Sequence, residues 1–131
     1  MKNSTILSIC LIAMVSIIGL SCEKNSEEVK FMEVEYGILP LDEHISSITY
    51  IDASGKPVVT DDRAEFVNGS KKLSVSAKSF TATMEVLINN TTQDEKRYII
   101  GILVDGDVRA FENVTCPPNA MALGKVEYKI Q

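Results

Sequence analysis

From residue 31 onward, apolar and polar residues alternate with a period of two, and this pattern constrains the fold more than any other feature. The alternation is clearest in residues 34–38, 73–77, 84–88 and 126–130. Successive side chains of a β-strand point to opposite faces, so each segment predicts a strand with one face in a core and the other in water. Antiparallel sheets with one solvated face have this pattern, whereas parallel strands are apolar on both faces.

Turn-forming residues separate these segments. They occur at 53–57 (ASGKP), at 68–70 (NGS), in the polar loop 89–96 (NNTTQDEK) and at Asp105-Gly106. Residues 98–104 (YIIGILV) are apolar on both faces and predict a central strand, and the prolines in 116–119 (CPPN) predict an extended connection to the last strand. Because no helical stripe follows Cys22, we expect an all-β protein: a single antiparallel immunoglobulin-like β-sandwich of about seven or eight strands.

The first 22 residues have a different character. Lys2 precedes an apolar run, residues 6–20, which is followed by Ser21, Cys22 and an acidic, polar stretch. The run is shorter than the roughly 18–20 apolar residues needed to span a bilayer. This arrangement resembles the signal peptide of bacterial lipoproteins, although Gly19 stands where that family prefers Leu. The resemblance implies that residues 1–21 are removed and that Cys22 carries acyl chains. The alternatives are a plain secretory signal and an uncleaved membrane anchor.

Residues 22–30 predict a lipidated cysteine followed by a flexible tether, because 23–30 (EKNSEEVK) is charged and has no periodicity. Glu23, Glu27 and Glu28 are similar to the acidic stretch that marks surface-exported lipoproteins of the Bacteroidetes type, although a solvated linker has the same composition. We therefore expect a lipid-anchored protein of the cell envelope, at the outer membrane, and both the periplasmic face and the cell surface stay open.

Residues 31–131 form the predicted β-sandwich domain. Residues 48–50 with Gly55, then 73–77 and 102–108, are similar to elements of small β-sandwich lipoproteins of gut Bacteroidetes. Through these they resemble the accessory domain of the mycobacterial small membrane proteins that accompany lipid exporters. The Leu-Pro-Trp segment often present in that family is missing, and residues 65–67 (EFV) stand in its region. The shared motifs mark hairpins and core positions, so the resemblance implies a fold and leaves the role open.

Charge limits the classes of partner. The 131 residues include 13 Lys and Arg and 18 Asp and Glu, which gives a net charge of −5. An acidic protein is a poor ligand for nucleic acid or anionic lipid, so membrane attachment is expected through acyl chains on Cys22.

Few residues suggest catalysis. His44 is the only histidine, which excludes a multi-histidine metal site within one chain. Residues 42–44, or Asp61-Asp62 with Asp105 and Asp107, could contact a divalent cation, but solvated loops and turns explain both groups. Cys116 has no local base or cation and predicts a buried side chain at a strand end, with an intermolecular disulfide as the alternative. We expect no metal, no cofactor and no enzymatic activity.

The sequence thus predicts a lipid-anchored binding or accessory module of the cell envelope that engages a protein partner. The alternatives are a glycan-binding or structural envelope lipoprotein and, less favoured, a small metal-dependent hydrolase. A chain without Trp has few aromatic side chains for a glycan platform. Binding loops are expected at the end of the sandwich far from Cys22, with these candidate residues: Asn90, Thr91, Thr92, Gln93, Asp94, Glu95, Pro117, Pro118 and Asn119.

Overall fold

The computed structural model describes residues 29–76 and 78–131, which form eight strands and one 3-10 turn. The elements are β1 (Phe31–Leu39), β2 (Ile45–Ile51), β3 (Pro57–Thr60), η1 (Arg63–Glu65), β4 (Ser70–Ser76), β5 (Phe80–Asn90), β6 (Lys96–Val104), β7 (Asp107–Cys116) and β8 (Ala120–Ile130). No helix among these residues is long and apolar enough to cross a membrane. The predicted signal peptide, Cys22 and most of the predicted tether lie outside the described residues, and exposed Val29 and Lys30 precede β1.

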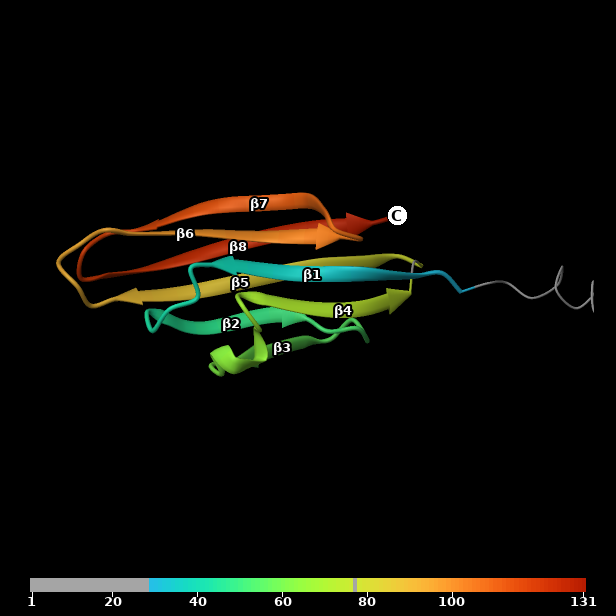
Figure 1. The fold of residues 1–131 in the computed structure, drawn as a ribbon, viewed down its shortest axis with the longest axis horizontal. Coiled ribbons are helices and arrows are strands. Elements are labelled where there is room, and N and C mark those ends of the chain that lie inside the picture. Colours follow the sequence, from blue (N-terminus) through green and yellow to red (C-terminus); the bar gives the residue numbers. More distant parts are fainter. Residues whose placement is uncertain (1–28, 77) are drawn as a thin grey trace, which may run out of the picture.

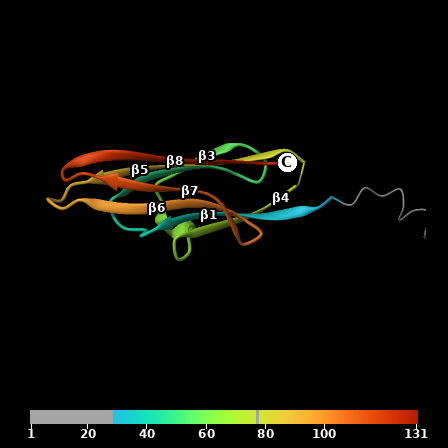
Figure 2. The same ribbon diagram turned by 90° about the horizontal axis from the view of Figure 1, so that it is seen from above.

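The strands form two four-stranded sheets that pack face to face. The β1 sheet has the order β4-β1-β6-β7 and the β2 sheet has the order β3-β2-β5-β8 (Figure 1). Every paired strand runs antiparallel to its neighbour. Figure 2 shows the two layers from above, with β1, β6 and β7 in one and β3, β5 and β8 in the other. The predicted all-β class and the antiparallel sandwich are confirmed.

The strand pairing shows how this sandwich relates to the immunoglobulin arrangement. Strands β1, β2, β3, β4, β5 and β8 pair with one another as strands B, C, C′, E, F and G of a variable domain do. The β6–β7 hairpin follows β5 in the chain but pairs with the other side of β1, at the edge where strand A lies in an immunoglobulin domain. This hairpin places β6 in the centre of its sheet, as the apolar segment 98–104 predicted.

The core lies between the two sheets and is built from the inward residues of the predicted alternation. Val34, Tyr36 and Ile38 of β1 and Val86 of β5 are fully buried, as is Ile102 of β6. The predicted register of these strands is therefore confirmed, since a shift of one residue would exchange the two faces of a strand.

One wall of the core is packed too closely for a side chain. A Cβ atom added to Gly124 of β8 would lie 2.5 Å from Val114 Cγ2 and 2.9 Å from Ile100 Cδ1. Ordinary carbon contacts are about 3.5–4.0 Å. Glycine at this position allows β8 to approach the side chains of the opposite sheet.

The predicted turns are present, but the connection predicted to be extended at 116–119 is instead a short turn, with Cys116 in β7 and Asn119 at a φ of 51°. Asp105 and Gly106, with φ of 50° and 84°, form the predicted tight hairpin between β6 and β7. The predicted loop 89–96 is too long, because β5 continues to Asn90 and β6 begins at Lys96. Residues 117–119 connect β7 of one sheet to β8 of the other, and the prolines prevent either strand from continuing there.

Candidate functional site

Two of the connections, residues 91–95 and 117–119, lie together at one end of the sandwich, and we call them the loop cap. Lys96 pairs with Cys116, and Asn90 pairs with Ala120, so both connections leave the sheets at the same level. Strand β1 runs from Phe31 toward this end. Figure 1 shows the loop cap at the left and the start of β1 at the right. The candidate loops are therefore far from the point where the described chain begins.

Asn90 joins the two connections. Its Nδ2 donates hydrogen bonds to the carbonyl oxygens of Asp94 (2.7 Å), Pro117 (3.0 Å) and Cys116 (3.3 Å). Its Oδ1 accepts hydrogen bonds from the Thr92 backbone N–H (3.0 Å) and from Thr92 Oγ1 (2.7 Å). One buried side chain thus holds both segments of the loop cap in a fixed relative position.

A direct backbone contact adds to this network, since the Asn119 N–H donates to the Thr92 carbonyl oxygen at 3.0 Å. The structure brings all nine candidate residues together, but it gives them different positions. Asn90 is fully buried, so its side chain organises the loops and cannot touch a partner, whereas Thr92 is half-buried. The exposed candidates are Thr91, Gln93, Asp94, Glu95, Pro117, Pro118 and Asn119.

The polar residues between β1 and β2 have structural partners next to the loop cap. The Tyr98 hydroxyl lies 3.0 Å from both Asp42 carboxylate oxygens, and the His44 backbone N–H donates to Asp42 Oδ1 at 3.0 Å. Burial raises the pKa of Tyr98, and the hydrogen bond to Asp42 raises that pKa further. The His44 carbonyl oxygen accepts a hydrogen bond from the Asn89 N–H at 2.8 Å. Asp42 therefore anchors the connection between β1 and β2.

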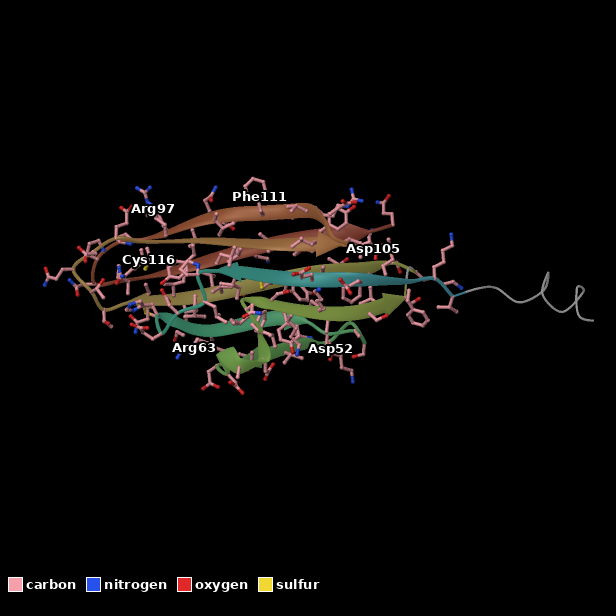
Figure 3. All side chains as sticks on the ribbon, viewed as in Figure 1. Asp52, Arg63, Arg97, Asp105, Phe111 and Cys116 are labelled. Atoms are coloured by element: carbon pink, nitrogen blue, oxygen red, sulfur yellow. The ribbon has the colours of Figure 1, made fainter. Side chains whose placement is uncertain are left out.

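The remaining candidates for chemistry are also occupied in the fold. In residues 29–76 and 78–131, no three His, Cys, Asp or Glu side chains gather closely enough to hold a metal ion. Asp62 accepts a hydrogen bond from the Ala64 N–H at the start of η1, and Asp105 accepts one from the Glu33 N–H. Cys116, labelled in Figure 3, is fully buried at the end of β7, with its Sγ 3.3 Å from the Ala120 carbonyl oxygen. Cys116 thus packs as the small buried side chain expected from the sequence.

Sequence reasoning missed a depression beside the loop cap. Its volume is about 500 Å³, and its lining includes Leu39, Pro40, Arg97, Ile99 and Thr115. These residues belong to segments far apart in the chain, which only the pairing of β1, β6 and β7 brings together. No local sequence pattern could have indicated it.

Comparison of the sequence with protein-family models and with curated proteins gives no match. The function is therefore inferred from the residues and their geometry alone.

Proposed function

We propose that this protein is a lipid-anchored binding module of the cell envelope, attached through Cys22, that engages a protein partner through the loop cap and has no catalytic activity of its own. The observation that carries the proposal is the position of the loop cap at the end of the sandwich away from Phe31 (Figure 1). A domain tethered through the residues before β1 would present these loops away from the bilayer.

The rigidity of the loop cap supports a binding role. A loop that is already ordered loses less conformational entropy when a partner binds, so more of the contact free energy appears as affinity. The Asn90 and Asn119 hydrogen bonds provide this order, while the exposed side chains of Gln93, Pro118 and their neighbours remain available for contact.

The composition of the loop cap favours a protein partner over a glycan. Residues 91–95 and 117–119 include no aromatic side chain, and Tyr36, Tyr50 and Tyr98 are buried in the core. The surface offers carboxylate, amide and proline groups instead, which suit hydrogen bonding to another polypeptide.

A photo-crosslinking amino acid placed at Gln93 or at Pro118 in the full chain tests the binding surface in cells. The matched control is Thr81, an exposed outward position on β5 near the other end of the sandwich. We expect one adduct of the same mass from both loop-cap positions and none from Thr81. Equal adducts from all three positions, or none from the loop cap, would remove it as the partner site.

Mass spectrometry of the membrane fraction tests the anchor separately. We expect a mature protein that begins with an acylated Cys22, and we expect Cys22→Ser to leave the membrane fraction. A Cys22→Ser protein that stays fully with membranes would contradict lipid anchoring while leaving the loop-cap result intact.

A further inference from the structure

The outer face of the β1 sheet is an apolar surface that neither the core nor the loop cap uses. Leu39 of β1, Ile99 of β6, and Val108 and Phe111 of β7 are 61%, 51%, 62% and 64% exposed. Most soluble proteins expose such side chains singly, and a contiguous group marks an interaction surface. The pairing of β1, β6 and β7 makes these residues neighbours on one face.

On this face, a projecting side chain and a hollow lie on neighbouring strands, at the same level along the strands. Gly37 pairs with Gly101, and Gly101 pairs with Phe111, so two residues without side chains lie beside a large exposed ring. A Cβ atom on Gly37 would approach only Leu103 Cδ1, at 3.9 Å. Figure 3 shows Phe111 projecting from β7 into solvent. A second surface with the same relief could seat its own Phe111 in the hollow.

We propose that this face binds the same face of a second copy of the chain, with the two-fold axis parallel to β6. Because such an axis exchanges β1 of one copy with β7 of the other, Phe111 of each copy lies over Gly37 of its partner. Ile99 and Leu103 lie on the axis and contact their own counterparts. Sheets that pack in this aligned manner interdigitate their side chains about 10 Å apart.

One oppositely charged pair on the face fits the same symmetry, whereas Arg97, an outward residue of β6 that is ion-paired with Glu95 at 2.9 Å, would face its own counterpart. Glu35 pairs with Leu103, and Leu103 pairs with Val108. Arg109 follows Val108 and is the extra residue where the register of β7 shifts. The proposed axis therefore places Glu35 of each copy opposite Arg109 of the other. Arg109 lies 3.7 Å from Asp107 and remains 45% exposed. This pair would favour a second copy of the chain at this face, although Glu35 also accepts a hydrogen bond from Ser70 Oγ within its own sheet.

The proposed axis is also compatible with the attachment of both copies to one membrane. This step of the argument rests on the proposed lipid anchor. An axis parallel to the strands keeps Phe31 of both copies at the same end, so both chains could attach to one bilayer. Antiparallel addition of β7 to β7, the alternative for an exposed edge strand, would place the two Phe31 residues at opposite ends. Because both chains would start at the same end, packing through this face is favoured over pairing of the two β7 edges.

The area of the face indicates how strong the dimer should be, and therefore which method can detect it. Three strands about 4.8 Å apart, with about seven residues rising about 3.4 Å each, cover roughly 14 by 24 Å. This is about 340 Å² per copy, which is below the range of stable specific interfaces, so the dimer is expected to be weak and transient when the domain is free in solution. Covalent trapping is therefore preferable to chromatography.

Cysteine crosslinking of residues 29–131, which contain all eight described strands and the core, tests the proposal. Cys116 is buried in this segment, so a cysteine introduced on the surface is the only accessible thiol. We expect Ile99→Cys, on the axis, to be linked to its counterpart by a short bismaleimide, because the Cα atoms of facing residues in two packed sheets are too far apart for a direct disulfide. Leu123→Cys, equally apolar and 60% exposed on the β2 sheet, is the matched control. Rapid dimerisation of Phe111→Cys, without that of Ile99→Cys, would instead show edge pairing and overturn the proposal.

Two sets of variants in the Ile99→Cys background examine the contacts. Gly37→Leu fills the hollow at a half-buried position on the outer face and should reduce the trapping rate about tenfold, which corresponds to about 1.4 kcal/mol. Glu35→Arg and Arg109→Glu should each reduce trapping, and the two together should restore it. Unfolding in urea verifies that each variant is folded. Trapping that is unchanged by Gly37→Leu, or equal for Ile99→Cys and Leu123→Cys, would refute the dimer.

Discussion

Glu112 on β7 accepts a hydrogen bond of 3.0 Å from the backbone N–H of Lys125 on β8. These strands are the edges of two different sheets, so the contact closes one side of the sandwich. An unpaired backbone N–H on an edge strand can pair with a strand of another molecule. The carboxylate of Glu112 occupies this donor.

We expect Glu112→Val to lower the free energy of unfolding by about 0.5–1.5 kcal/mol, because the exposed Lys125 N–H loses a charged acceptor that water replaces only in part. Amide hydrogen exchange at Lys125 should accelerate, and the protein should aggregate more readily. Glu112→Gln keeps an acceptor oxygen and serves as the control. Equal exchange rates in all three proteins would show that the contact does not protect this edge.

Truncation in the core should cost far more than truncation on the surface of the same sandwich. Ile102→Ala removes a fully buried side chain and should cost about 2–5 kcal/mol through lost burial and the remaining cavity. Glu85→Ala removes a half-exposed carboxylate 3.5 Å from Lys125 Nζ, which should cost below about 1 kcal/mol. Urea unfolding measures both, and similar losses would contradict the assigned inward and outward faces.

Asn90→Ala should destabilise the loop cap, because the carbonyl groups of Asp94, Cys116 and Pro117 lose their shared donor. We expect a loss of about 1–3 kcal/mol and faster amide exchange at Thr92 and Asn119. Asn90→Asp is the informative comparison, since it keeps the acceptor for Thr92 but cannot donate to the carbonyls. A fully stable Asn90→Asp protein would show that the donated bonds are dispensable.

Two glycines should respond oppositely to alanine. Gly124→Ala places a methyl group within 2.5 Å of Val114 Cγ2, and overpacking of this kind costs about 1–3 kcal/mol. Gly37→Ala meets nothing closer than 3.9 Å and should be neutral or slightly stabilising, since alanine restricts the unfolded chain. Thermal unfolding distinguishes the two, and a stable Gly124→Ala protein would mean that β8 can move away from the opposite sheet.

The fold should lose stability in alkali. Burial raises the pKa of Tyr36 and, together with the hydrogen bond to Asp42, the pKa of Tyr98 above the ordinary value of 10.0. The folded protein then holds these protons more tightly than the unfolded chain. Unfolding releases protons once the pH exceeds about 10, so the free energy of unfolding is unaffected below that pH and falls above it. Tyr98→Phe should reduce this fall, and an unchanged alkaline slope would contradict the assignment.

The strands were predictable because the sequence specifies the local period directly. Val34, Tyr36 and Ile38 alternate with polar or small residues, and Asp105-Gly106 supplies the left-handed backbone that a tight hairpin requires. The pairing of β6 with β1 was not predictable, because it joins residues 34–39 to residues 99–104, which no local sequence pattern links. The depression beside the loop cap could not be predicted for the same reason.

The composition of the sequence indicated where the candidate loops lie, but not which of their residues hold the loops together. Asn90 lies in a polar run that reads as solvated loop, yet its acceptors at residues 116 and 117 are 26 and 27 positions away in the chain. Contacts of this range depend on tertiary structure. The short turn η1 also escaped prediction, since three residues are too few to show a helical period.

The Asn90 network has a consequence for how this protein could change over generations. Three of the groups that Asn90 holds are backbone carbonyl oxygens, which every amino acid possesses. Substitutions at Gln93, Asp94 or Pro118 can therefore alter the chemistry of the surface without removing the bonds that shape it. A lineage could acquire a new partner through such substitutions while its loop geometry stayed the same.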